Sequence, residues 1–154
     1  MEWRKAVFDS IRRIVRAVRL SSRSSESIVG LSAAQLFVLQ RLAEHDGLSI
    51  NELARETLTH QSSVSVLVSK LAARRLVRRA ISRLDRRRTV ISLSAKGRRA
   101  LAGAPEAMQV RLIAALNDLS NADVTRLARL LARWTRAAGI ADTAPTLFGE
   151  EEGR

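Results

Sequence analysis

The residues of this chain that could do chemistry are mostly arginines and lysines, and they gather in one segment. Between residues 70 and 99 there are twelve bases and a single acid, Asp85. Guanidinium and ammonium groups bind phosphate oxygens, so such a segment predicts contact with a polyanion. The whole chain has the same sign: 27 Lys and Arg against 15 Asp and Glu in 154 residues give a formal net charge of +12. Charge alone does not separate DNA from RNA or from an anionic membrane.

Residues suited to covalent or metal chemistry are few. The chain has no cysteine and no tyrosine, which excludes disulfides, thiolate metal ligands and cysteine nucleophiles. Its two histidines, His45 and His60, do not have the spacing of a metal-binding pair. We therefore expect no enzyme activity, no cofactor and no metal. Residues 1–20 lack the apolar core of a signal peptide, so we expect a soluble, cytoplasmic protein with no membrane partner.

Three short helices are expected between residues 33 and 75. Ser32 is followed by Gln35, and Ser49 by Glu52, at capping-box spacing, which predicts helices over 33–44 and 50–56. A third helix follows over 62–75, and the last two have the spacing of a helix-turn-helix, whose second helix enters a major groove. Serines at a helix start also serve as simple caps. The free face of the third helix would carry the candidate DNA contacts Gln61, Ser62, Ser63, Ser65, Ser69 and Lys70.

A charged hairpin is expected directly after this helix pair. Apolar residues alternate over 77–81 and 89–93, and the segment between them is too charged to be core. An arginine at a hairpin tip can enter a narrow minor groove, and a neighbouring aspartate can hold its guanidinium in place. The candidate residues of this wing are Asp85, Arg86, Arg87 and Arg88. Close to the helix pair, the candidate phosphate contacts are His60, Arg74 and Arg75.

Both ends of the chain carry amphipathic helices. Apolar residues recur at steps of three and four near the N-terminus and again over 110–116 and 124–134, with arginines between them. The first stripe could lie on an anionic membrane, but packing against a partner helix is the favoured interpretation. Stripes that a small domain cannot bury alone predict a two-fold dimer. Its expected interface residues are Val7, Ile11, Ile14, Val18, Leu127, Leu131 and Trp134.

Taken together, these motifs resemble the MarR family of winged helix-turn-helix transcriptional regulators. The resemblance is carried by Asn51-Glu52-Leu53-Ala54, Ser62-Ser63-Val64-Ser65 with Leu71, Asp85-Arg86-Arg87 and Leu93-Ser94-Ala95-Lys96-Gly97. It departs from the family at Leu58, where the turn usually has glycine, and at Ser94, which replaces a threonine. By this resemblance, Arg87 is the family's wing arginine.

The resemblance implies one MarR-like domain over 1–154, mainly α-helical with a small β-hairpin wing. A winged helix-turn-helix lobe would span 32–100 between dimerisation segments at 4–28 and 101–139. A flexible acidic tail is expected over 141–154, which contains Pro145 and three consecutive glutamates.

The function expected from this resemblance is sequence-specific regulation of transcription, with repression as the favoured mode. A homodimer would bind double-stranded DNA at a near-palindromic operator. Family members usually sense small aromatic anions in a crevice between the dimerisation helices and the DNA-binding lobe, and no residue of this sequence identifies such a ligand. The alternative is a nonspecific nucleic-acid-binding or compacting protein that uses charge alone. An aromatic content of 3% leaves little for base stacking and disfavours an RNA binder.

Overall fold

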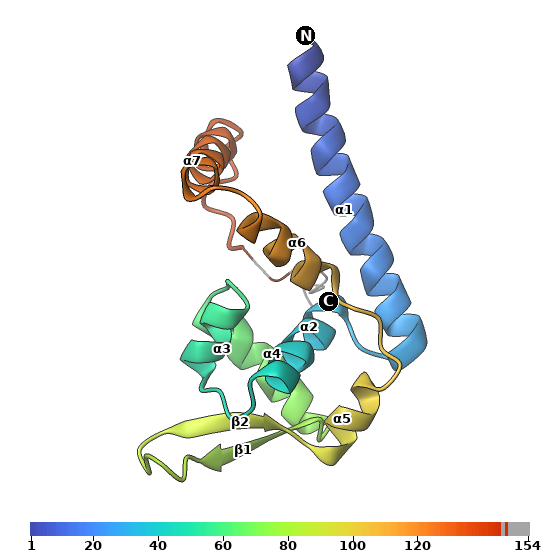
Figure 1. The fold of residues 1–154 in the computed structure, drawn as a ribbon, viewed down its shortest axis with the longest axis vertical. Coiled ribbons are helices and arrows are strands. Elements are labelled where there is room, and N and C mark those ends of the chain that lie inside the picture. Colours follow the sequence, from blue (N-terminus) through green and yellow to red (C-terminus); the bar gives the residue numbers. More distant parts are fainter. Residues whose placement is uncertain (146, 148–154) are drawn as a thin grey trace.

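The structure is a computed structural model, and it describes residues 1–145 and Leu147. Within these residues the chain is mainly helical with one two-stranded antiparallel sheet, as expected. Its elements in chain order are α1 (Glu2–Val29), α2 (Ala33–Glu44), α3 (Ile50–Glu56), α4 (Gln61–Ala73), β1 (Val77–Ile81), β2 (Thr89–Leu93), α5 (Ala95–Leu101), α6 (Met108–Asn117) and α7 (Asn121–Ala137). Figure 1 shows a lobe formed by α2–α5 and the hairpin, with α1, α6 and α7 extending away from it.

Side-chain caps begin the helices where the sequence predicts them. The Ser32 hydroxyl accepts a hydrogen bond from the Gln35 backbone N–H at 3.2 Å, and the Gln35 side chain accepts one from the Ser32 N–H. Ser49 and Glu52 form the same reciprocal pair at the start of α3. Ser120 caps α7 through the Asp123 N–H at 3.1 Å. These caps satisfy N–H groups that have no partner inside a helix, which explains why the predicted starts are confirmed.

The core of the lobe is built around α2. Phe37 and Leu39 of α2 are fully buried, and they belong to one apolar cluster with Leu53 of α3 and Leu67 of α4. Buried side chains of the hairpin, among them Ile91, complete the cluster. Because one core holds all of these elements, the α3–α4 pair and the hairpin sit on a common support.

The hairpin pairs Val77 with Leu93 at one end and Ile81 with Thr89 at the other. The loop before α3 adds to this sheet, because Leu48 and Ile91 exchange backbone hydrogen bonds of 3.1 and 2.7 Å. At the start of α5, Gly97 lies directly against the Leu76 carbonyl, so a Cβ at this position would collide with backbone. This close approach gives a physical reason for the glycine in the Leu93-Ser94-Ala95-Lys96-Gly97 motif.

Several predicted boundaries need correction. The first helix runs from Glu2 to Val29 and is longer than the dimerisation segment expected over 4–28. Helix α4 begins at Gln61 and ends at Ala73, because Arg75 adopts a left-handed conformation with φ 59° that ends the helical path. Helix α5 ends at Leu101. In the linker that follows, the Gln40 amide donates to the Pro105 carbonyl at 2.8 Å and accepts from the Ala107 N–H at 3.0 Å.

The terminal helices leave apolar side chains uncovered in the single chain. No residue of α7 is buried, and α1 buries only Val18 and Ser25. Val18 was expected at a dimer interface; the chain's own packing already leaves it only 7% exposed, so little of its side chain remains for a partner to cover. Among the described residues, no helix combines the length and apolar character needed to cross a membrane.

The flexible tail expected over 141–154 falls largely on residue 146 and residues 148–154, which lie outside the described residues. Leu147 is described and differs from that expectation. It is 6% exposed and belongs to the core cluster of the lobe.

Candidate nucleic-acid interface

The turn between α3 and α4 sets the angle at which α4 is presented. Leu53 and Ala54 are buried on α3, and Val64 is buried on α4. The Thr57 hydroxyl donates to the Leu53 carbonyl at 2.8 Å, and the Thr59 N–H donates to the Ala54 carbonyl at 3.0 Å. These contacts hold the two helices in one arrangement.

Leu58 occupies the tightest point of this turn. Its φ is 50°, in the left-handed region that favours glycine, and its side chain is 66% exposed. The structure thus explains why a glycine is usual at this place in the turn: the backbone needs a positive φ there. This chain adopts the same conformation with a leucine, so the departure from the family's pattern leaves the turn intact.

Helix α4 presents a polar face to solvent at its N-terminal end. Gln61, Ser62 and Ser65 are exposed, and Ser63 is half-buried. His60 occupies the N-cap position, is exposed, and makes no side-chain cap hydrogen bond. The first N–H groups of α4 therefore point outward without a side-chain acceptor from His60, in the geometry that binds anions.

Farther along α4, Lys70 is exposed but Ser69 has a structural partner. The Ser69 hydroxyl accepts a hydrogen bond from the Arg79 guanidinium at 3.0 Å. Because Arg79 lies on β1, this contact joins α4 to the hairpin. Ser69 was predicted to face DNA; it is exposed, and its hydroxyl also links the helix to the hairpin, so its contact with DNA stays a prediction.

The tip of the wing is shaped by two side chains that bind backbone. The Ser82 hydroxyl accepts from the Leu84 N–H at 3.2 Å and from the Asp85 N–H at 3.3 Å. The Asp85 carboxylate accepts from the Arg87 backbone N–H at 2.9 Å. Asp85 was predicted to hold an arginine guanidinium. It holds the Arg87 backbone instead, because the N–H two residues ahead is the donor that a short carboxylate reaches most easily.

The arginines of the wing divide into two groups. Arg86 and Arg87 are exposed, and neither guanidinium forms an ion pair within the described residues. Arg88 was predicted as a DNA contact, but its guanidinium pairs with the Glu52 carboxylate of α3. This pair joins the tip end of the wing, just before β2, to the helix-turn-helix across 36 positions of sequence.

Glu52 has two tasks at this junction. Its carboxylate accepts the Ser49 N–H and the Ser49 hydroxyl, both at 2.8 Å, and also receives the Arg88 guanidinium. The hydrogen bonds from Ser49 lower the pKa of Glu52 below its ordinary value of 4.5, and Arg88 lowers it further. The residue is therefore ionised at neutral pH, which keeps the pair with Arg88 charged.

The predicted phosphate contacts differ in the hydrogen bonds that they already make within the chain and in their distance from the start of α4. Arg74 is exposed, but its guanidinium donates to the Gln35 side chain at 3.2 Å. Arg75 is exposed, and its carbonyl accepts the Ser94 hydroxyl at 2.7 Å. Both lie past the C-terminal end of α4, about 20 Å along the helix from Gln61. The structure therefore does not bring them together with His60 at the N-terminal end.

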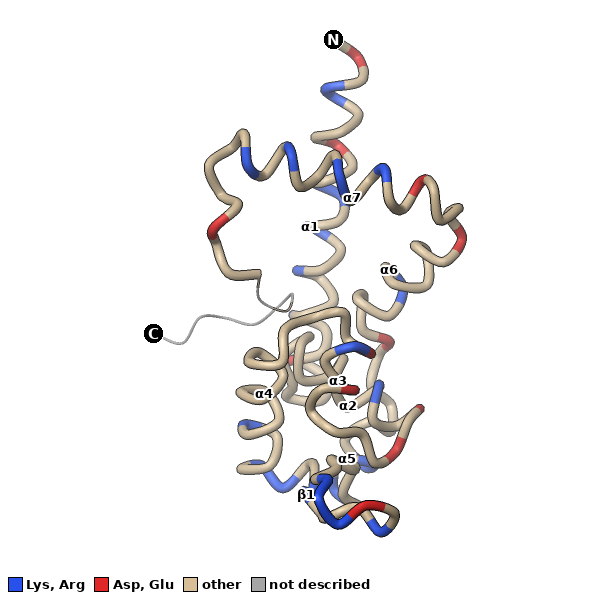
Figure 2. The backbone as a smooth tube through the Cα atoms, turned by 90° about the vertical axis from the view of Figure 1, so that its left-hand side faces the viewer, with Lys and Arg blue, Asp and Glu red and all other residues tan. Residues whose placement is uncertain are grey.

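Three exposed arginines around the hairpin were counted in the basic segment but not assigned to the site: Arg78, Arg79 and Arg83. Because they lie on β1 and beside the hairpin tip, next to predicted wing residues, their sequence position could have identified them as part of the site. Figure 2 shows basic residues following the hairpin and the adjoining end of α4, with the acid of the wing among them.

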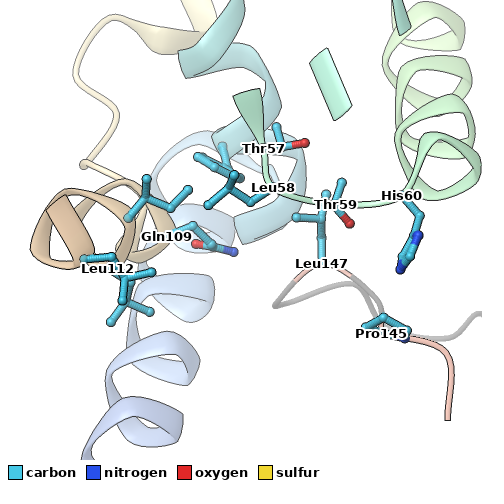
Figure 3. Close-up of a pocket in the computed structure, with 11 residues that line it drawn as sticks. Thr57, Leu58, Thr59, His60, Gln109, Leu112, Pro145 and Leu147 are labelled. Carbon is cyan, nitrogen blue, oxygen red and sulfur yellow. The ribbon is translucent and has the colours of Figure 1, made fainter. Parts of the chain in front are cut away.

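A crevice of about 310 Å³ lies behind the α3–α4 turn. In Figure 3, Thr59, His60 and Leu147 lie on one side, with Gln109 and Leu112 of α6 opposite. Its walls are mostly apolar, and they include Phe37 of the core. Because the wall includes residues 57–60, the crevice touches the segment that leads directly into α4.

Comparison with known proteins agrees with this geometry. The MarR family model matches residues 29–88, which cover the start of the lobe, the helix-turn-helix and the wing tip. The HTH-type transcriptional repressor MdtR of Bacillus subtilis (strain 168) is 28% identical over 88 residues. That alignment covers 57% of this chain and 57% of the repressor, so it spans little more than half of the curated relative.

Solved structures extend the match to most of the chain. A probable transcriptional regulator from Pseudomonas aeruginosa is 30% identical with a TM-score of 0.55, covering 83% of this chain and 98% of that one. The transcriptional regulator BldR from Sulfolobus solfataricus is 26% identical with a TM-score of 0.57, covering 86% and 96%. The turn, the wing and these similarities lead to one conclusion: the chain belongs to the MarR family of transcriptional regulators.

Proposed function

We propose that this protein is a cytoplasmic, homodimeric repressor that binds double-stranded DNA sequence-specifically through α4 and the wing. The observation that carries the proposal is the polar start of α4 beside an arginine-rich hairpin, both held on one core. A nonspecific binder needs only charge. This chain also has a rigidly supported helix with short polar side chains free to meet bases.

The two parts of the interface have different tasks. The N-terminal end of α4 enters the major groove, where Gln61, Ser62 and Ser65 are short enough to reach base edges and phosphates. The tip of the wing reaches the neighbouring minor groove, where Arg87 meets the negative potential of a narrow A·T-rich segment. Asp85 supports this contact by fixing the Arg87 backbone at 2.9 Å.

A second copy of the chain covers the apolar faces of α1 and α7. Between these helices lies a groove of about 640 Å³, lined by residues such as Trp3, Ile14 and Leu131. Phe8 of α1 and Trp134 of α7 meet edge to face, with ring centroids 5.8 Å apart, yet both remain exposed. Two-fold pairing would present two copies of α4, and the operator would be a near-palindrome with half-sites about one helical turn apart.

We propose that a ligand that releases the protein from DNA binds in the crevice behind the α3–α4 turn. A small aromatic anion, the effector class implied by the family, would find apolar walls there and the His60 side chain. Binding there would act on residues 57–60, and through them on the start of α4.

A salt titration tests the DNA contact of the wing. Arg87→Ala should weaken binding to a duplex, and the slope of log affinity against log salt should become shallower by about one unit, because one fewer counterion is released. The control is Arg126→Ala, an exposed arginine on α7 outside the proposed interface. If the salt slope is the same for the wild type and Arg87→Ala, Arg87 does not contact DNA. If Arg87→Ala and Arg126→Ala weaken DNA binding equally, the wing contributes only its general positive charge.

A further inference from the structure

The crevice behind the α3–α4 turn is partly walled by the chain's own C-terminal segment. Pro145 and Leu147 line it, although α7 ends at Ala137 and lies away from the lobe. Figure 1 shows the chain after α7 running back toward the lobe. Leu147 reaches 6% exposure and joins the core cluster that contains Phe37. A segment outside the regular elements thus supplies a core residue.

The local backbone directs the segment on this path. Gly139, with φ 71°, ends the helical path of α7, and the Ile140 N–H donates to the Thr135 carbonyl at 3.0 Å. Residues 141–145 are exposed, which contrasts with the burial of Leu147. One buried leucine after an exposed stretch is the pattern of a single anchor.

We propose that Leu147 is a displaceable part of the crevice wall, and that an apolar ligand binds most tightly when it displaces Leu147 and takes over the apolar surfaces that Leu147 contacts. Figure 3 shows Leu147 beside Thr59 and near His60, the residues that lead into α4. Leu147 and an incoming ligand use the same apolar walls, so they compete. The ligand class that fits is a small apolar molecule with one anionic or hydrogen-bonding group, because the polar side chains of the lining are few.

This competition extends the proposed function, because it adds a regulatory element that belongs to the chain itself. When Leu147 is seated, it contacts the wall formed by the α3–α4 turn. When a ligand displaces Leu147, residues 57–60 contact the ligand instead of Leu147. The state of the C-terminal segment is thereby coupled to the segment that positions α4.

The absence of cysteine makes the seating of Leu147 directly measurable. Leu147→Cys introduces the only thiol of the chain, and Ile140→Cys places a matched thiol on the same segment at a residue that is 54% exposed. Reaction with a soluble disulfide reagent should be at least about tenfold slower at position 147, because a thiol reacts only when accessible. Both rates should become equal in denaturant. Equal rates in the native protein would overturn the proposal.

A second measurement tests the competition without using DNA. Binding of 1-naphthoate to the full-length wild type is compared with Leu147→Asp, which disfavours burial, and with Ile140→Asp, which adds the same charge nearby. Leu147→Asp should bind about tenfold more tightly, because a larger fraction of the protein then has an open crevice. Ile140→Asp should match the wild type. Equal or weaker binding by Leu147→Asp, including no binding by any variant, would overturn the competition and leave the proposed DNA binding unaffected.

Discussion

Replacing Glu52 by glutamine separates positioning from charge in the wing. The wild-type carboxylate caps α3 by accepting the Ser49 N–H at 2.8 Å, and it pairs with the Arg88 guanidinium. Glutamine at this position of a capping box still accepts the N–H, so α3 should remain intact. The ion pair that joins the wing to the helix-turn-helix is lost. If that pair positions the wing, DNA binding should weaken although a negative charge has been removed.

The expected size follows from the exposure of the pair. The side chain of Arg88 is 41% exposed and that of Glu52 is 28% exposed, so solvent screens their attraction. Pairs of this kind contribute about 0.2–1 kcal/mol. Since about 1.4 kcal/mol corresponds to a tenfold change, DNA affinity should fall by about 1.4- to 5-fold. Charge removal alone predicts a change of opposite sign, because DNA is a polyanion.

Fluorescence anisotropy with a labelled duplex at two salt concentrations measures this difference. The matched control is Glu44→Gln, which removes the same charge and breaks the pair that Glu44 forms with Arg41 at 2.9 Å on α2. Glu44→Gln should bind as well as the wild type or slightly better. If Glu52→Gln binds as tightly as Glu44→Gln, or more tightly than the wild type, the positioning role of Glu52 is refuted.

The same variant has a signature in pH-dependent stability. The pKa of Glu52 is lowered in the folded protein, mainly by hydrogen bonds from Ser49 and also by Arg88. Its ionised form therefore stabilises the fold above the ordinary value of 4.5, and this contribution is lost as the pH falls through the lowered pKa. The difference in thermal midpoint between wild type and Glu52→Gln should be present at pH 7 and should shrink as the pH falls from 4.5 toward 3. A difference that stays constant over this range would contradict the assignment.

Three further predictions concern the turn, the wing and the dimer. Leu58→Gly should raise the free energy of unfolding by about 0.5–1 kcal/mol, because glycine adopts φ 50° without strain and the leucine side chain that is lost is exposed. Urea unfolding measures this change, and a lower free energy of unfolding would contradict the prediction. Asp85→Ala should weaken DNA binding, because the Arg87 backbone N–H loses its acceptor. Tighter binding at every salt concentration would instead show that the wing acts only through its positive charge. Leu131→Glu places a charge on the apolar face of α7 and should yield monomers in sedimentation at micromolar concentration, where the wild type should be dimeric.

Local signals were sufficient to predict most of the fold. The starts of α2 and α3 follow from a serine and its partner three residues later. The two strands follow from alternation and from the charged residues between them. The left-handed conformation of Leu58 is consistent with the glycine that the family's pattern has at that place. The caps and the turn depend on groups within a few residues of one another, and each strand on a pattern within its own short segment.

The differences at the candidate site involve partners from other elements or choices among nearby donors. Arg88 finds Glu52 only because the common core places the wing beside α3. Ser69 meets Arg79 when β1 turns back along α4. The burial of Val18 and Leu147 depends on how the terminal segments fold back, and no periodicity in the sequence encodes that. At Asp85 the sequence identified the residue, but not its choice of a backbone donor over a guanidinium.

The most direct test of the central claim is the specificity ratio of the purified protein for DNA. A duplex recovered by selection from a random pool would be titrated against a shuffled duplex of equal length and composition at about 0.15 M salt. Sequence-specific recognition by α4 predicts a near-palindromic selected site and a preference of at least about 10³-fold. A ratio near one, with no common sequence among the recovered duplexes, would contradict the account and identify a protein that binds nucleic acid through charge alone.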